Sequence, residues 1–260
     1  MINRRSCHVL TRGPARLCAL LAGLLILATP AVGRELVIAT SSSIPPYVIT
    51  DQHRGIVVEI LQEALLPHGH QIEFIYAPNR RVEHMIEEQR VDGVYNLAAG
   101  SLDDVHYSDA IIDYHNVAIT LADFPHKIDS LASLQDLRVV VFQNAPKFLG
   151  PEFVKLINAG HDFPEVSNQR SQVLMLFRGR ADVIIMEQRI FEYFHNQLRS
   201  SGEIGGGYRI HTLFPPAPRY AAFIDEDIRD QFNAGLQTLK DSGRLQAIIQ
   251  RYLGTSSETE

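Results

Sequence analysis

The sequence predicts an α/β protein that folds into two lobes, and three observations support this prediction. Short apolar, β-branched runs alternate with segments whose apolar residues recur at helical spacing, which is typical of sheets covered by helices. The strand–helix–strand scheme restarts after residues 123–129, and a proline-rich connector at residues 214–219 precedes one further strand. Two crossings between the same lobes make a hinge, so we expect a ligand cleft between the lobes.

The N-terminus has the pattern of a cleaved secretory signal peptide, which we place at residues 1–33. Four arginines precede an apolar run at residues 17–28, and small residues occupy positions 31 and 33. Signal peptidases read this order of features. The apolar run is short for a membrane span. We therefore expect an exported, soluble periplasmic protein, and an uncleaved anchor is the alternative.

Removal of the signal peptide changes how the composition is read. It leaves 227 of the 260 residues, which is enough for one large core or two small ones. Both cysteines, Cys7 and Cys18, leave with it, so we expect no disulfide and no cysteine metal site. The remaining 20 basic and 30 acidic residues argue against nucleic acid or an anionic membrane surface as a partner.

The first half of the chain alternates strand and helix signals. Strands are expected at residues 35–39, 72–76 and 91–97, with helices at residues 56–66 and after Pro78. We expect parallel sheets with helices on both faces.

The second half repeats the scheme. Strands are expected at residues 138–142, 181–186, 208–213 and 220–224. Helices are expected at residues 131–137, 151–157, 172–178 and 190–198, with two more around residues 232–239 and 245–252. We assign residues 34–121 plus 219–254 to lobe 1, residues 122–218 to lobe 2, and residues 255–260 to a flexible tail.

Several short motifs occur in an order that resembles a known family. They lie at residues 41–47, 55–60, 90–94, 105–108, 179–183 and 236–254. Together they are similar to the amino-acid-type extracytoplasmic solute-binding proteins, family 3, of bacterial ABC transporters, over about residues 35–254. The resemblance implies a type 2 periplasmic-binding fold, in which both chain ends build one lobe and a ligand binds between the lobes.

Two candidate ligand-binding residues follow from position and resemblance. Glu187 ends a predicted strand, where carboxyl ends of parallel strands face a crevice. The resemblance implies an acid there that holds a ligand ammonium group, and a solvated glutamate at a helix start is the alternative. Tyr47 follows two prolines and offers a rigid aromatic surface, with core or rim packing as the alternative. The stacking aromatic of the family aligns with Ile44.

The arginine that grips the ligand carboxylate in the family has no counterpart here. Residues 96–104 replace the motif that carries it, and no lysine or arginine lies between Arg90 and Lys127. Arg81, at a predicted helix N-terminus, is the candidate replacement, with a solvated surface arginine as the alternative.

Polar residues at predicted strand ends complete the candidate site. Asn96 and Asn144 offer amides that both donate and accept hydrogen bonds, and turn chemistry is the alternative. Ser42, Gln143 and Arg170 are weaker candidates.

The eleven histidines form no metal-binding motif, and no phosphate loop or dinucleotide fingerprint occurs, so we expect neither a metal nor a cofactor. The expected function is capture of a small polar metabolite, an amino acid or related carboxylate, by lobe closure for an ABC transporter permease. We expect a monomer without enzymatic activity. The alternatives are an exported enzyme that resembles cyclohexadienyl dehydratases and a ligand-binding sensor for a membrane receptor. The sequence leaves the ligand open.

Overall fold

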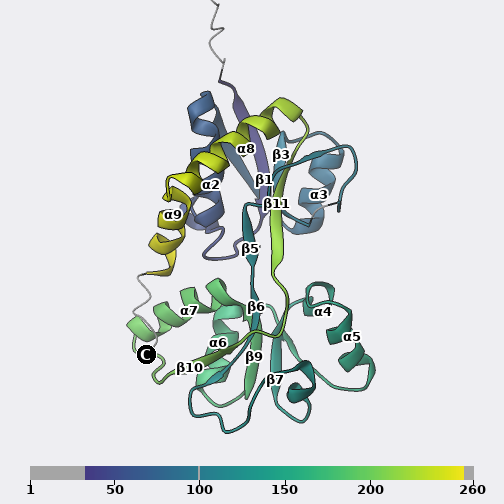
Figure 1. Ribbon diagram of the computed structural model, residues 1–260, viewed down its shortest axis with the longest axis vertical. Coiled ribbons are helices and arrows are strands. Elements are labelled where there is room, and N and C mark those ends of the chain that lie inside the picture. The colour runs from purple at the N-terminus through teal and green to yellow at the C-terminus, as the bar shows by residue number, and fades with distance from the viewer. Residues whose placement is uncertain (1–32, 99, 255–260) are drawn as a thin grey trace, which may run out of the picture. The chain divides into compact units, whose positions relative to one another are not determined.

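The computed structural model describes residues 33–98 and 100–254. The predicted tail and, apart from Gly33, the predicted signal peptide lie outside the described residues. Residues 33–254 form one compact unit, in which two β-sheets each carry helices on both faces (Figure 1). We call the unit around the first sheet lobe 1 and the unit around the second sheet lobe 2.

Lobe 1 is built on a six-stranded sheet with the order β2-β1-β3-β11-β4, in which β5 pairs only with β11. Its strands are β1 (Glu35–Ser41), β2 (Gln71–Ala77), β3 (Gly93–Leu97), β4 (His106–Tyr107), β5 (Ile112–Tyr114) and β11 (Ala217–Phe223). Strand β1 lies inside the sheet because its run 36–39 is apolar on both faces, and only Glu35 at its start is exposed.

Lobe 2 is built on a five-stranded sheet with the order β10-β6-β9-β7-β8. Its strands are β6 (Asn116–Leu121), β7 (Val139–Phe142), β8 (Glu165–Val166), β9 (Val183–Glu187) and β10 (Tyr208–His211). Every residue of β9 is buried, as expected for the strand at the centre of the sheet.

Both sheets are mixed, which corrects the expectation of purely parallel sheets. Strands β1, β2 and β3 are parallel to one another, as are β7, β8 and β9. Strand β11 runs antiparallel to β3, β4 and β5, and β6 runs antiparallel to β9 and β10. These antiparallel strands are the ones that carry the chain between the lobes, so they lack the crossover helices that force parallel pairing.

Helices cover the two faces of each sheet (Figure 1). In lobe 1 they are α2 (Ile56–Leu65), α8 (Glu226–Asp241) and α9 (Arg244–Leu253) on one face and α3 (Asn79–Glu87) on the other. In lobe 2 they are α6 (Gln169–Phe177) and α7 (Gln188–Ser200) on one face and α4 (Ala145–Phe148) and α5 (Pro151–Asn158) on the other. Short 3₁₀ turns lie at Thr50–Gln52, Leu66–His68 and Leu131–Leu134.

The chain crosses between the lobes twice, side by side. Only His115 separates β5 of lobe 1 from β6 of lobe 2, and the return crossing leads into β11. Sheet membership therefore places the first crossing at residue 115 rather than at the predicted residue 121. The reason is that Asn116–Leu121, a mostly apolar strand, pairs with β9 and not with lobe 1.

In each lobe, an aspartate just before one strand accepts a hydrogen bond from the backbone near the start of the neighbouring parallel strand. The Asp92 carboxylate accepts a hydrogen bond from the Val37 backbone at 2.7 Å, and the Asp182 carboxylate accepts one from the Arg138 backbone at 2.9 Å. Each aspartate precedes its strand by one position and so satisfies an N–H group at the sheet edge. This shared role explains the two Asp-containing motifs of the sequence.

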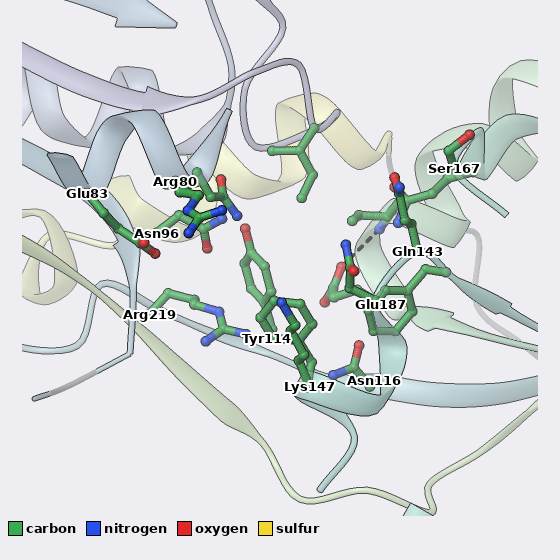
Figure 2. A pocket seen from close by; sticks show the side chains of 17 residues that line it. Arg80, Glu83, Asn96, Tyr114, Asn116, Gln143, Lys147, Ser167, Glu187 and Arg219 are labelled. Carbon is green, nitrogen blue, oxygen red and sulfur yellow. Dashed lines mark hydrogen bonds between the residues drawn. The ribbon is translucent and has the colours of Figure 1, made fainter. Parts of the chain in front are cut away.

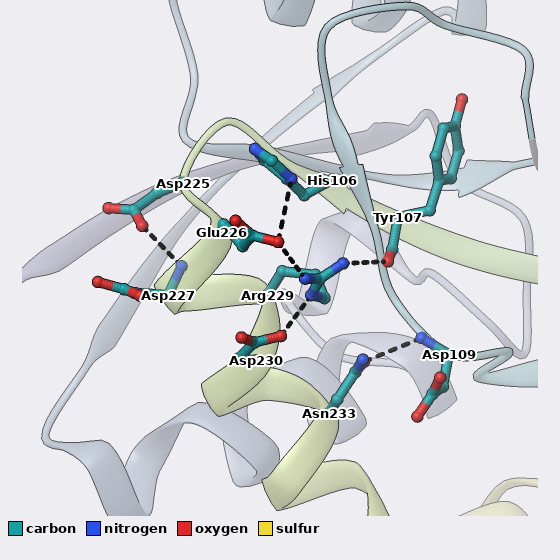
Figure 3. Close-up of polar contacts among 9 residues, drawn as sticks. All are labelled: His106, Tyr107, Asp109, Asp225, Glu226, Asp227, Arg229, Asp230 and Asn233. Carbon is teal, nitrogen blue, oxygen red and sulfur yellow. Dashed lines mark hydrogen bonds and ion pairs between the residues drawn. The ribbon is translucent and has the colours of Figure 1, made fainter.

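Helices α8 and α9 are tied to lobe 1 by polar contacts at their ends. Figure 3 shows Arg229 of α8 between Glu226, Asp230 and the Tyr107 carbonyl, which it reaches at 3.4 Å. In α9, the Tyr252 hydroxyl accepts a hydrogen bond from the Gly55 backbone at 3.0 Å and donates one to Glu59. The C-terminal segment therefore completes the lobe in which the described chain begins.

Candidate functional site

A cleft of about 840 Å³ lies between the two lobes and is lined by both. Its lining residues are Ile44, Asn79, Arg80, Glu83, Asn96 and Arg219 of lobe 1, Tyr114 at the crossing, and Asn116, Phe142, Gln143, Asn144, Lys147, Phe148, Ser167, Gln169, Glu187 and Ile190 of lobe 2. The carboxyl ends of β3, β7 and β9 supply Asn96, Phe142 and Glu187. This is the edge at which α/β sheets bind ligands.

Four of the predicted residues line this cleft, namely Asn96, Gln143, Asn144 and Glu187. Asn96 has a positive φ of 78° and donates a hydrogen bond to the Ser41 hydroxyl at 3.0 Å. That hydroxyl donates in turn to the Asn79 side chain at 2.8 Å. The Asn144 backbone donates to Glu165 at 2.7 Å and begins α4. Figure 2 shows Asn96 and Gln143 on opposite sides of the cleft.

The structure places the other predicted residues outside the lining. Tyr47 is fully buried, and its ring stacks on Tyr114 with centroids 4.5 Å apart. It therefore supports the residue that faces the cleft. Ser42 is exposed, and Arg170 forms an ion pair with Glu203 at 2.5 Å. Helical geometry explains the correction at Arg81, because successive side chains point about 100° apart and Arg80 is the one that faces the cleft.

Glu187 is the buried carboxylate of the cleft, with 3% of its surface exposed. Its Oε1 accepts a hydrogen bond from the His115 backbone at 3.2 Å, and its Oε2 accepts one from the Ile190 backbone at 3.0 Å, which caps α7. Arg189 Nη1 lies 3.8 Å from Oε1. Burial raises the pKa of Glu187 to about 7, against the opposing effects of Arg189 and the two backbone N–H groups.

Arg219 is the buried cation of the cleft, and the sequence reading missed it. It is 9% exposed, and its Nε has no hydrogen-bond partner. Its guanidinium carbon lies 4.9 Å from the centroid of the Tyr114 ring and 5.9 Å from that of Phe148. No acidic residue of the described chain pairs with it. Burying a charge without a partner costs free energy of folding, so an anion bound beside Arg219 would offset this cost.

A strand irregularity accompanies the position of Arg219. The register between β11 and β3 shifts between Tyr220 and Ala221, one residue after Arg219. Such bulges re-aim neighbouring side chains. In the sequence Arg219 ends a proline-rich connector, and this position predicts a linker residue and not a ligand contact. The available signal is an arginine two positions before the apolar run Ala221–Phe223, with no acidic residue until Asp225.

Two buried tyrosine hydroxyls near Arg219 have no hydrogen-bond partner other than each other. Tyr95 on β3 is 1% exposed and Tyr114 on β5 is 6% exposed, and each hydroxyl lies near the other and has no further hydrogen-bond partner in the described protein. Burial raises the pKa of both hydroxyls, so both stay protonated and can donate. Tyr114 lines the main cleft, and Tyr95 lines an adjoining recess of about 310 Å³ that shares Arg219, Lys147 and Asn96 with it.

Further charged side chains line the cleft around Arg219 and the two tyrosines. Arg80 and Lys147 are exposed and face the cleft from α3 and α4, and Glu83 of α3 is the acid that lobe 1 contributes to the lining. None of the three forms an ion pair with another described residue. Figure 2 shows Arg80, Glu83 and Arg219 on one side, Lys147 and Tyr114 in the middle, and Glu187 on the other side.

Other kinds of site receive no support from the described residues. Residues 33–98 and 100–254 hold no group of three or more His, Cys, Asp or Glu side chains placed to bind a metal ion. In the same part of the chain, no helix combines the length and apolar character needed to cross a bilayer.

The sequence profile of the bacterial extracellular solute-binding proteins, family 3, matches residues 36–255. The chain belongs to this family. The members are mainly binding proteins without enzymatic activity. No curated protein matches the chain at a significant level.

Solved structures share the fold of this family 3 protein. An ancestral cationic amino acid solute-binding protein superposes with a TM-score of 0.69 at 16% identity, over 84% of this chain and 95% of that one. A histidine kinase sensor domain with similarity to periplasmic binding proteins reaches 0.65 at 17% identity, over 85% and 97%. The GluR0 ligand-binding core from Nostoc punctiforme, in complex with L-glutamate, reaches 0.60 at 17% identity, over 84% and 98%. These matches confirm the type 2 periplasmic-binding fold.

Proposed function

We propose that this family 3 protein is an exported, monomeric periplasmic binding protein. It captures a small polar metabolite, an amino acid or related carboxylate, by closure of its lobes and presents it to the permease of an ABC transporter. Lobe 1 then comprises residues up to 115 together with β11, α8 and α9, and lobe 2 comprises the segment between the crossings. Residues 1–33 serve as the signal peptide.

The observation that carries this proposal is the unpaired, buried guanidinium of Arg219 at the hinge side of the cleft. The residues that line the cleft come from both lobes, so a ligand that touches Arg219 and Glu187 contacts both at once. Binding energy shared between two lobes favours the closed form over the open one. The guanidinium supplies the anion contact for which the family's usual arginine is missing.

We expect replacement of Arg219 to stabilise the ligand-free protein and to weaken its affinity for the ligand. In Arg219→Met, removal of an unpaired buried cation raises the stability of the ligand-free protein by about 1–3 kcal/mol. The same change weakens the binding of a carboxylate ligand by about 100-fold, because a charge-assisted contact is lost. Arg170→Ala, which removes a paired arginine outside the cleft, leaves ligand affinity unchanged.

The experiment is a thermal-shift screen of amino acids and organic acids, followed by calorimetry of the hits on these three proteins. A ligand at a hundred times its Kd stabilises the folded protein by about 2.7 kcal/mol, which is easily measured. No shift with any compound, or equal affinity of wild type and Arg219→Met, contradicts the proposal.

A second candidate function is an exported enzyme of the dehydratase type, and the pKa of Glu187 favours it. A carboxyl group whose pKa is about 7 can donate a proton near neutral pH. However, both oxygens already accept backbone hydrogen bonds, which suits a structural cap. Incubation with a cyclohexadienyl acid, followed by ultraviolet absorbance, distinguishes turnover from binding. A sensory role uses the same cleft, and uptake of the labelled ligand by cells with and without the gene separates it from transport.

A further inference from the structure

The floor of the cleft presents buried hydrogen-bond donors that have no acceptor elsewhere in the described protein. They are Arg219 Nε and the hydroxyls of Tyr95 and Tyr114. A hydrogen bond between the two neighbouring hydroxyls uses one of them as the donor and leaves the other free to donate to a ligand. The three side chains come from β11, β3 and β5, three strands held in one sheet, so their positions are fixed by the fold. Stacking of Tyr114 on Tyr47 holds the Tyr114 ring from behind, while Arg219 lies over its other face.

A donor set of this kind fits an oxyanion. An arginine has no acceptor, and a tyrosine that stays protonated offers its O–H as a donor. Each group buried without a partner costs free energy, and a carboxylate oxygen satisfies several of them together. This anion contact lies on the hinge strand β11 and not on the loop after β3.

At the opposite end of the cleft, groups of the protein already occupy about half of the roughly four acceptor positions of the Glu187 carboxyl. Each oxygen of Glu187 already accepts a backbone N–H, and Arg189 lies 3.8 Å away. A ligand ammonium at Glu187 would meet the field of this arginine, which is 23% exposed in its side chain. Burial also keeps a large part of Glu187 protonated near pH 7, and a protonated carboxyl donates to a ligand oxygen instead.

The charges that remain in the lining are mostly positive. A protonated Glu187 carries no charge, which leaves Arg80, Lys147 and Arg219 against Glu83 in the lining. Three cations against one acid leave two positive charges for a bound ligand to balance. Asn79, Asn96 and Asn144 offer amides to uncharged oxygens between them.

We propose that the cleft selects small dicarboxylic acids that carry a hydroxyl or keto group and no ammonium group, with one carboxylate on Arg219 and Tyr114. This inference rests on the solute-binding function proposed above and narrows its ligand class. The second carboxylate lies toward Arg80 or Lys147, and the uncharged oxygen lies toward Glu187.

The test compares acids that differ only in one group, an amine or a hydroxyl. The pairs are malate with aspartate and 2-hydroxyglutarate with glutamate, each titrated by calorimetry into wild type, Glu187→Gln and Arg219→Met. We expect one hydroxy acid to bind at least about tenfold more tightly than its amino partner, a difference of about 1.4 kcal/mol. We expect Glu187→Gln to retain this binding within about threefold and Arg219→Met to lose about 100-fold.

Three results overturn the inference. The first is an amino acid that binds as tightly as its hydroxy partner, and the second is loss of binding in Glu187→Gln while its circular dichroism spectrum is unchanged. The third is binding of neither pair while the thermal-shift screen finds another ligand, which leaves the solute-binding function standing. If no compound in the thermal-shift screen changes the melting temperature, both proposals are wrong.

Discussion

The buried carboxyl of Glu187 predicts a specific dependence of stability on pH. Burial raises its pKa from 4.5 to about 7 in the folded protein. The folded state therefore holds this proton more tightly than the unfolded state between these two pH values. The contribution of Glu187 to the free energy of unfolding is largest at acidic pH, falls as the pH rises from 4.5 to about 7, and is constant above.

The size of this effect follows from the pKa difference. At about 1.4 kcal/mol per pH unit, ionisation of Glu187 lowers the free energy of unfolding by about 3 kcal/mol between pH 4 and pH 8. In Glu187→Gln this loss disappears, because the amide does not ionise, while its oxygen can still accept one backbone N–H. The difference in unfolding free energy between wild type and variant therefore changes by about 3 kcal/mol over this range.

Urea unfolding followed by far-ultraviolet circular dichroism measures this difference, since the chain contains no tryptophan. Titrations of all other groups are common to both proteins and cancel in the comparison. Glu152→Gln, a change at a glutamate whose side chain is 68% exposed, serves as the control and follows the wild type at every pH. A constant difference between wild type and Glu187→Gln from pH 4 to pH 8 refutes the reasoning about burial.

Three further predictions concern the cleft rim and the packing of lobe 1. Arg80→Ala weakens binding of an anionic ligand by about tenfold in calorimetry, whereas Arg81→Ala leaves it unchanged, and the reverse result contradicts the assignment of the cleft-facing arginine. Gly235→Ala destabilises the protein by about 3 kcal/mol in urea, because the added Cβ would lie 2.0 Å from the Ala64 carbonyl oxygen; Gly205→Ala, with no atom within 4 Å, changes stability little. Equal effects of the two glycine variants argue against the close approach of α8 to α2. Tyr252→Phe leaves the Gly55 N–H without its partner and costs about 1–2 kcal/mol, and an unchanged urea midpoint contradicts the role of this hydroxyl.

Apolar pattern was sufficient to predict most of the architecture. The helices α5, α6 and α7 and the strands β7 and β9 lie within a few residues of their predicted ranges, because each combines a continuous apolar face with a clear start or end. Strand β6 was missed as the first strand of lobe 2. Its apolar run fits either lobe equally well, and only its pairing with β9 assigns it to the second sheet.

The polar residues of the site were predicted less completely than the fold. Asn96, Gln143, Asn144 and Glu187 follow strands, and the edge of a sheet brings such residues together. Arg219, in contrast, reaches the cleft through the return crossing, 100 or more positions from Asn96 and Tyr114 in the sequence. A contact of this kind depends on which strands cross at the hinge, and no local pattern encodes it.

No local sequence pattern indicates that the Glu187 carboxylate already accepts hydrogen bonds from within the protein. As the alternative of a glutamate at a helix start implies, Glu187 accepts a hydrogen bond from the Ile190 backbone, although its side chain is buried and not solvated. The second bond, from His115, comes from the crossing segment. Tertiary structure therefore decides whether this acid is available to a ligand.

Small-angle X-ray scattering with and without ligand tests most directly whether an anion that contacts Arg219 closes the two lobes. For wild type, the radius of gyration should fall when a carboxylate ligand from the screen is added at saturation. Arg219→Met should keep the ligand-free value at the same concentration, and Arg170→Ala should close as wild type does. A radius of gyration that stays constant in wild type with bound ligand, or that falls equally in Arg219→Met, contradicts the account.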